Sequence, residues 1–189
     1  MKKLFLLPVL LFSIFLTSCA DEDITGILSA TNGENPEQTA LQNIHDENGN
    51  LFSWYSSLDP KTLWELQQAR AATAKYQDLN KALADGYQDI AVDVENMGHH
   101  YMNFNLLDGT FDLKKPEILI YNRLEDGTPV LMAVEYAIPI ADPQPEGFYG
   151  NADVWNGNSP FPLWLVHAWV WTYNPEGAFN WTNPLVHLN

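Results

Sequence analysis

The chain has 189 residues, a formal net charge of −15 and a single cysteine. Such an acidic surface repels nucleic-acid phosphates and anionic lipid headgroups, which excludes recognition of either by a basic patch. One cysteine cannot form an intrachain disulfide, so the fold must depend on a hydrophobic core, to which 7 Trp, 8 Tyr and 9 Phe can contribute.

The first predicted element is a secretory signal peptide at residues 1–18. Lys2 and Lys3 precede a mainly apolar run from Leu4 to Leu16, and small residues follow it. The run of about 13 residues is shorter than the roughly 20 that a transmembrane helix needs. A cleaved signal is therefore favoured over the alternative, a retained membrane helix.

The segment Leu16-Thr17-Ser18-Cys19 resembles the lipobox of bacterial lipoproteins. The resemblance implies that the mature chain begins at Cys19, which carries acyl chains such as palmitate and anchors the protein in the bacterial outer membrane. Two or more acyl chains hold a protein stably at a membrane. The acidic run at 21–23 resembles the surface-export signal of Bacteroidota lipoproteins, but it also fits a plain linker. Both the periplasmic face and the cell surface therefore remain open.

Residues 19–50 are predicted to form a flexible acidic tether, and residues 51–189 a single globular domain. The tether is rich in Asn, Gly, Glu, Asp and Thr and has few large apolar residues. Without Lys2 and Lys3 the mature chain has 7 basic and 24 acidic residues, a net charge of 7 − 24 = −17.

A long helix, or two helices in succession, is predicted between Asp59 and Gly86. Asp59 is a suitable N-cap before Pro60, and Gly86 is a suitable stop. The apolar positions recur at helical spacing. They are Leu63, Leu66, Ala69, Thr73, Tyr76, Leu79 or Asn80, and Leu83.

Strand patterns dominate the chain after Gly86. Residues 117–121 and 130–138 flank a turn at 125–128 and predict a β-hairpin. Residues 142–162 are rich in Pro and Gly and predict a long loop, and residues 163–172 predict a third strand. Helix followed by antiparallel strands favours an α+β fold, in which the helix packs on a small antiparallel sheet or partial barrel.

Two polar residues interrupt these apolar strands. His167 alternates with Leu165, Trp169 and Trp171, and both faces of that strand are apolar. Glu135 is predicted to share a face with Leu131, Ala133 and Ala137, which leave room around its carboxylate. A buried imidazole or carboxylate requires a hydrogen-bonding, charged or metal partner.

A third candidate is in the segment Gly98-His99-His100-Tyr101. Alternation places His100 with Gly98 and Met102, and His99 with Tyr101. The inward position is assigned to His100, with His99 as the second choice.

Several segments together are similar to a family of small secreted bacterial proteins for which no activity is established. They are residues 97–101, 133–136, 167–171, 174–179 and 183–186, with Asp78 and residues 82–87 on the predicted helix. The resemblance covers about residues 72–186. It implies that His100 is the histidine of the family's GxHY motif and His99 its variable position, and it implies no catalytic residue.

His100, Glu135 and His167 are thus predicted to converge on one pocket. Two imidazoles and a carboxylate with an open position fit Zn²⁺ or another divalent transition metal. A metal-free network, in which Glu135 only orients the histidines, explains the same residues.

Two further functions remain as alternatives. Exposed aromatic side chains, with Trp155 as the best candidate, fit a module that binds glycans or other nutrients, whereas Trp169 fits the core or the pocket wall. The last alternative is a structural envelope lipoprotein without catalytic activity. Phosphate-binding loops, dinucleotide fingerprints and Gly-x-Ser-x-Gly elbows are absent from the sequence.

Overall fold

The structure, a computed structural model, describes residues 49–188. The predicted signal peptide, Cys19 and all but the end of the predicted tether lie outside the described residues. Within residues 49–188, no helix has both the length and the apolar character needed to cross a membrane.

The helices come first in the described chain. They are α2 (Leu51–Trp54), α3 (Pro60–Thr73), the 3₁₀ turn η1 (Ala74–Gln77) and α4 (Leu79–Ala84). Asp59 caps α3 by accepting a hydrogen bond from the Lys61 amide at 2.8 Å, and Pro60 takes the first helical position, as predicted.

Residues 60–84 do not form one continuous helix. Asp78 breaks the helical path and caps α4 through the Asn80 amide at 3.0 Å. The break rotates α4 relative to the predicted apolar stripe. Ala82 is therefore buried, whereas the predicted core residue Leu83 is 46% exposed.

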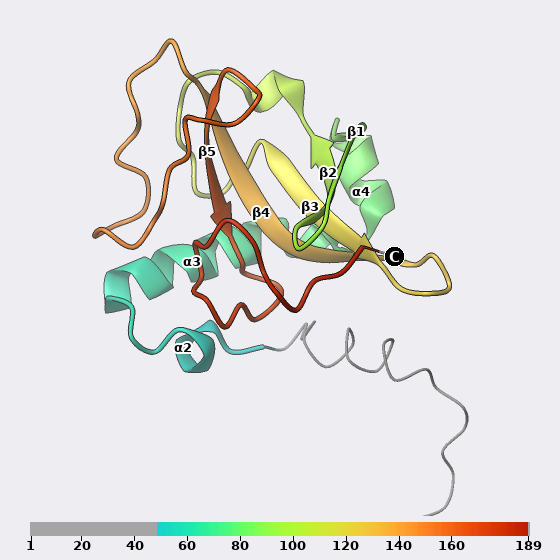
Figure 1. Cartoon of the computed structure of the whole chain (residues 1–189), viewed down its shortest axis with the longest axis horizontal. Helices are drawn as coiled ribbons and strands as arrows, with labels where there is room; N and C mark the ends of the chain where they lie inside the picture. The colour runs from blue at the N-terminus through green and yellow to red at the C-terminus, as the bar shows by residue number, and fades with distance from the viewer. Residues whose placement is uncertain (1–48, 189) are drawn as a thin grey trace, which may run out of the picture. The chain divides into compact units, whose positions relative to one another are not determined.

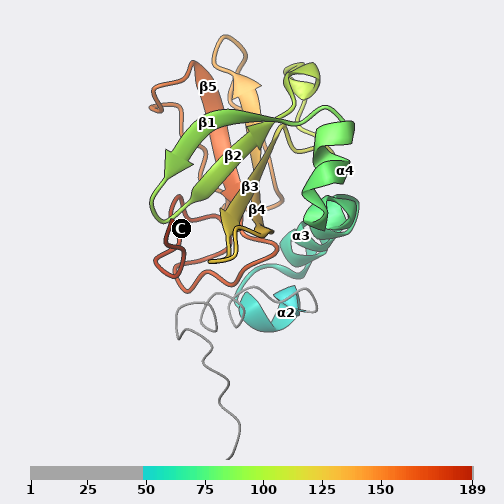
Figure 2. The same ribbon diagram turned by 90° about the vertical axis from the view of Figure 1, so that its right-hand side faces the viewer.

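Five antiparallel strands form one sheet in sequence order, which confirms the α+β class. They are β1 (Gln88–Val94), β2 (Gly98–Met102), β3 (Ile118–Arg123), β4 (Pro129–Pro139) and β5 (Leu163–Ala168), with the 3₁₀ turn η2 (Phe104–Leu106) after β2. Among the described residues β1 does not pair with β5, so the sheet is open. Figures 1 and 2 show α3 and α4 along one side of this sheet.

The two faces of the sheet carry separate hydrophobic clusters. On the helix face, Leu66 of α3 belongs to the same cluster as sheet residues such as Leu119 and Tyr136. On the other face, Met102, Ile118 and their neighbours form a smaller cluster. We call this second side the pocket face, because the cavity described below opens from it.

The predicted hairpin is formed by β3 and β4. Its turn is closed by a hydrogen bond from the Leu124 amide to the Thr128 carbonyl at 2.9 Å, and Gly127 has a φ of +83°. Ile120 pairs with Ala133, but the next residue, Tyr121, pairs with Leu131, so Met132 of β4 has no partner in β3. Leu131 consequently lies on the helix face, and the prediction that it shares a face with Glu135 is wrong.

The third strand is shorter than predicted, because β5 ends at Ala168. The Val170 amide donates to the Ala168 carbonyl at 2.9 Å, which turns the chain and ends the alternation. Trp169 remains on the pocket face, but Trp171 packs on the helix face under the Arg70 guanidinium, 4.3 Å from its ring centroid. The predicted shared face of His167 and Trp171 is therefore wrong.

Candidate metal centre

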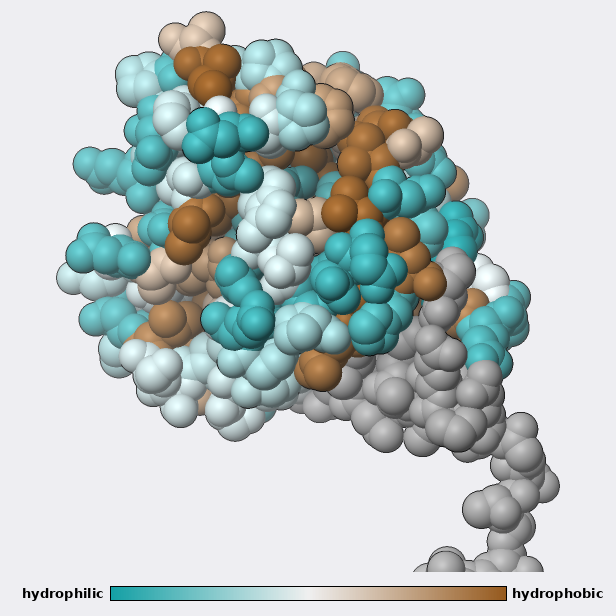
Figure 3. All heavy atoms as spheres, in the orientation of Figure 1, coloured by the Kyte–Doolittle hydropathy of each residue, from teal (hydrophilic) through white to brown (hydrophobic). Residues whose placement is uncertain are grey.

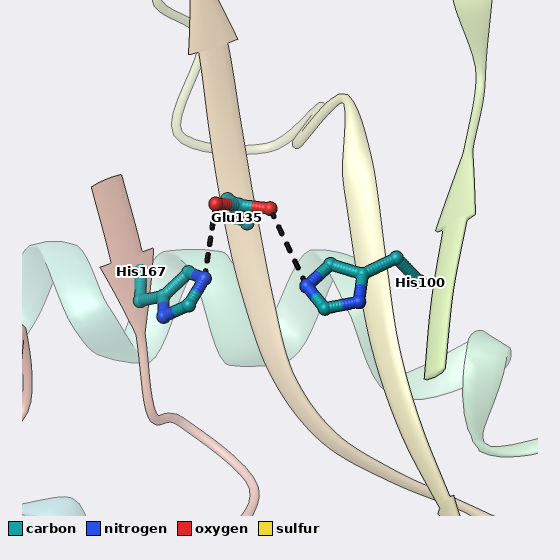
Figure 4. A group of neighbouring side chains, drawn as sticks. All are labelled: His100, Glu135 and His167. Atoms are coloured by element: carbon teal, nitrogen blue, oxygen red, sulfur yellow. Dashed lines mark ion pairs between the residues drawn. The ribbon is translucent and has the colours of Figure 1, made fainter. Parts of the chain in front are cut away.

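Three strands bring His100, Glu135 and His167 together on the pocket face. Glu135 in β4 is directly opposite His167 in β5, and it is also opposite Ile118 in β3. His100 in β2 pairs with Ile120 of β3, which is two residues from Ile118 and therefore on the same face of that strand. The three side chains therefore point from β2, β4 and β5 to the same side of the sheet, across the intervening β3 (Figure 4).

The Glu135 carboxylate lies between the two imidazoles. His167 Nε2 is 2.9 Å from Glu135 Oε1, and His100 Nε2 is 3.9 Å from Glu135 Oε2. One ligand atom from each residue lies within 4.8 Å of the other two. All three residues are buried, with exposures of 5% or less.

Both imidazoles use their other ring nitrogen to contact a backbone carbonyl. His100 Nδ1 is 2.8 Å from the Val92 carbonyl oxygen, and His167 Nδ1 is 2.6 Å from that of Trp181. A carbonyl only accepts, so each Nδ1 carries the hydrogen and donates it. In the neutral rings, each Nε2 then directs a lone pair towards the region of Glu135.

The Val92 carbonyl reaches His100 because β1 is irregular at this point. The pairing of β1 with β2 shifts between Asp89 and Asp93, and Ala91 adopts a φ of +54°. Positive φ is uncommon for alanine, and such bulges often re-aim groups next to functional sites. Here the bulge lies opposite His100 and orients a carbonyl towards its ring.

His167 is held more firmly than His100. Its ring stacks on Trp181 with a centroid distance of 4.5 Å and an interplanar angle of 5°, and Trp169 packs edge-on at 6.0 Å. Although His167 Nε2 is 2.9 Å from Glu135 Oε1, it satisfies no hydrogen bond among the described residues. A buried ring nitrogen without a partner requires an explanation.

Burial and charge act in opposite directions at this site. Burial lowers the pKa of His100, and the Glu135 carboxylate offsets only part of that effect, so His100 is neutral near pH 7. Burial by itself raises the pKa of Glu135, but attraction to the histidines in their protonated forms, with His167 contributing most, brings it below its ordinary value. The site therefore combines a carboxylate with a neutral His100 that is available as a ligand.

The centre adjoins a cavity of about 600 Å³ on the pocket face. His100 and Glu135 line its floor, whereas His167 lies behind them against Trp181. Three protein ligands with open space on one side are the arrangement of metal sites that bind an exogenous molecule.

The second-choice residues lie elsewhere, except for Trp169. His99 points to the other side of β2, where its Nδ1 is 2.7 Å from Asp93 Oδ1. Trp155 is half-buried, with its indole edge-on to Phe111 and its Nε1 donating to Asp153. Its ring packs against the helix-face cluster and is thus remote from the three-residue centre.

Sequence reasoning missed the two carbonyls that orient the histidines. The Val92 carbonyl depends on a bulge that side-chain alternation does not reveal. Trp181 lies in the irregular segment after the last strand. No sequence pattern there indicates that its carbonyl contacts His167. By contrast, the alternation of Ile90, Val92 and Val94 was a readable signal for β1.

Comparison of the chain with protein-family models, with curated proteins and with solved structures gives no match in any of the three. The geometry of the site is therefore the evidence from which a function can be argued, and the resemblances noted in the sequence stay predictions.

Proposed function

We propose that His100, Glu135 and His167 bind one divalent transition-metal ion, and that this centre holds a small ligand in the adjoining cavity. The observation that carries the proposal is the unpartnered Nε2 of His167, 2.9 Å from a buried carboxylate oxygen. One ion bound by both groups would hold His167 Nε2 and a Glu135 oxygen close together, and the two atoms are close here.

The orientation of the imidazoles supports a metal over a purely hydrogen-bonded network. In a network, Glu135 accepts hydrogen bonds from ring N–H groups. Here each ring uses its Nδ1–H for a backbone carbonyl, and an Nδ1–H bonded to a carbonyl or carboxylate is the usual outer partner of a metal-binding histidine. The remaining Nε2 atoms are then free to act as ligands.

The donor set indicates which metals fit. Imidazole nitrogens suit Zn²⁺, Fe²⁺, Ni²⁺ and Cu²⁺, whereas Mg²⁺ and Ca²⁺ prefer sites made only of oxygen. Two histidines and one carboxylate are the ligands of several catalytic zinc sites and of the facial triad of non-haem iron sites. Zn²⁺ is the natural first test because it needs no redox partner.

The surroundings favour ligand binding over a hydrolytic reaction. Apart from His100 and Glu135, the lining residues with a polar side-chain atom are Ser159 and Trp181. Neither is an effective general base, and a metal-bound water needs a proton acceptor for efficient hydrolysis. Polarisation of a bound ligand by the metal remains the chemistry that this site supports best.

Metal binding is tested on the domain purified without an affinity tag and treated with chelator. Zn²⁺ or Co²⁺ is then titrated, with the charge-transfer and d–d absorption of Co²⁺ as a second signal. We expect one ion per chain in the wild type and a severe loss of affinity in His167→Ala and His100→Ala.

His99→Ala is the matched control, since it removes the neighbouring imidazole from the other side of β2. It should leave stoichiometry and affinity unchanged. The proposal is overturned if the folded wild-type protein takes up no metal, or if His99→Ala and His100→Ala behave alike.

We also propose that the protein is a lipoprotein attached to the bacterial outer membrane through acylated Cys19. The support is the lipobox-like sequence that ends at this residue. Cells grown with labelled palmitate should incorporate label into the wild-type protein and none into Cys19→Ala. Equal labelling of the two proteins would contradict the anchor.

A further inference from the structure

The cavity beside the centre is formed by three parts of the chain that are distant in sequence. They are the inner side of β1 and β2, the segment after β2, and the segment that leads into β5. Among its lining residues are Ile90 and Val92 of β1, Met102 of β2, Phe104, Phe161 and Trp181. Its volume of about 600 Å³ falls within the range of roughly 300–1,000 Å³ that is typical of pockets for small organic ligands.

The walls of the cavity are almost entirely apolar and partly open to water. At its mouth, Phe104 is 53% exposed and Phe161 is 43% exposed. In Figure 3, hydrophobic side chains gather over β1 and β2 on the face that Figure 1 views. Large exposed apolar side chains around a concave apolar surface mark a site that an apolar molecule covers.

The charged groups of the cavity are confined to its floor. The lining includes one acid, Glu135, and one histidine, His100, and no lysine or arginine. A ligand that fills the cavity must therefore be mainly apolar along its body, and it meets ionisable side chains only at the end that reaches Glu135 and His100. The distribution of polarity thus sets both the ligand's class and its orientation.

The charge of that polar end follows from the proposed metal centre, on which this step rests. A divalent cation with one carboxylate and two neutral imidazoles has a net charge of +1 in apolar surroundings. An anionic donor neutralises this charge, whereas an alcohol does not. Without the metal, the Glu135 carboxylate would repel the same anion.

We propose that the cavity binds a monocarboxylate with an aliphatic body, such as a medium-chain fatty acid, whose carboxylate completes the coordination of the metal at His100, Glu135 and His167. The aliphatic chain lies between the β1 side chains Ile90, Val92 and Val94 and the loop around Phe161. No covalent step is involved, and the carboxylate replaces solvent at the open position.

The test compares decanoate with decanol by calorimetry, on Zn²⁺-loaded and on metal-free protein, below the critical micelle concentration of decanoate and the solubility limit of decanol. We expect decanoate to bind the loaded protein at least about tenfold more tightly than decanol, and the preference to disappear or reverse without metal. On Co²⁺-loaded protein, decanoate but not decanol should change the d–d absorption spectrum.

A pair of phenylalanines provides a matched control for the cavity wall. Phe161 lines the mouth, whereas Phe52 is in α2, has a similar exposure of 48% and does not line the cavity. Phe161→Ala should weaken decanoate binding several-fold while Zn²⁺ stoichiometry stays at one. Phe52→Ala should change neither property.

The failures of the two proposals are distinguishable. If the protein binds Zn²⁺ but not decanoate, or binds decanoate and decanol equally, the fatty-acid assignment is overturned and the metal centre stands. If the folded protein takes up no metal, the metal centre is overturned together with the carboxylate preference. Equal effects of Phe161→Ala and Phe52→Ala would overturn the placement of the aliphatic chain.

Discussion

The two faces of the sheet each bury a glutamate, but they treat it in opposite ways. Glu117 is 1% exposed near Tyr87 and Tyr136, and its carboxylate accepts a hydrogen bond from the Ala137 amide at 2.9 Å. Burial raises its pKa to about 8. Glu135 is 2% exposed, yet its pKa lies below the ordinary value because two imidazoles adjoin it.

The comparison shows that burial alone does not make a functional carboxylate. On the helix face, Glu117 is kept largely protonated near pH 7 and acts as a polar group of the core. On the pocket face, Glu135 keeps its charge beside a cavity and two histidines. A buried carboxylate that stays ionised and adjoins a cavity, as Glu135 does, is a candidate metal ligand, whereas a protonated one such as Glu117 is a structural group.

The largest effect should come from the helix face and should leave the centre intact. Leu66 is fully buried in α3, and Leu66→Ala should lower the free energy of unfolding by about 2–5 kcal/mol because it leaves a cavity. Urea denaturation measures this loss. Zn²⁺ affinity of the folded variant should be unchanged, and a parallel loss of affinity would show that the two faces are coupled.

The second effect is confined to the pocket face. Glu135→Gln keeps the shape of the side chain but removes the charged ligand, so Zn²⁺ affinity should fall by more than the roughly 10–100-fold that outer-shell partners are worth. Competition with a chromogenic chelator measures it. Glu125→Gln, in the exposed turn between β3 and β4, is the control and should bind Zn²⁺ like the wild type. Retained affinity in Glu135→Gln would contradict its role as a ligand.

The third effect is the pH dependence that Glu117 imposes on stability. Its pKa is about 8 in the folded protein and 4.5 for an unperturbed glutamate, so between these values the folded state holds more protons than the unfolded state. Stability therefore falls as pH rises through this window, by up to about 1.4 kcal/mol per pH unit from this group.

Glu117→Gln removes this contribution, because the amide does not titrate. Relative to the wild type, the variant should gain stability steadily from pH 5 to pH 8, while the difference should be constant below pH 4. Urea denaturation at a series of pH values measures the difference. A difference that stays constant across the window would contradict the raised pKa.

The smallest effect tests a single hydrogen bond on the helix face. The Tyr87 hydroxyl donates to the Pro116 carbonyl at 2.6 Å, and both groups are removed from water. Tyr87→Phe should cost about 1–2 kcal/mol of unfolding free energy, because the carbonyl loses its partner. Thermal unfolding measures this loss. An unchanged Zn²⁺ stoichiometry in the variant would show that the effect is confined to the helix face.

Side-chain alternation was sufficient to find the three residues of the centre but not to describe how they are held. Glu135 and His167 are anomalous in apolar strands, and His100 alternates with Gly98 and Met102, so the pattern selects one candidate on each strand. That the three share one side of the sheet follows from the strand register. These are local properties of each strand, and local patterns can be read from sequence.

The parts that could not be predicted are the parts that depend on irregular backbone and distant packing. The extra residue Met132 in β4 and the turn that ends β5 at Ala168 each change which face of the sheet the following residues occupy. The faces predicted for Leu131 and Trp171 were wrong for this reason. The Trp181 ring stacks on His167 from an irregular tail, and no periodicity indicates such a contact. Sequence spacing allowed one long helix or two in succession, and only the packed structure places the break before Asp78, which caps the second helix.

The bulge in β1 has a consequence beyond the orientation of His100. β1 is an edge strand, whose unpaired backbone groups would otherwise offer a template to the edge of another molecule. The positive φ of Ala91 interrupts the regular ladder, and the exposed carboxylates of Asp89 and Asp93 flank the interruption. This edge is therefore a poor template for strand pairing between molecules.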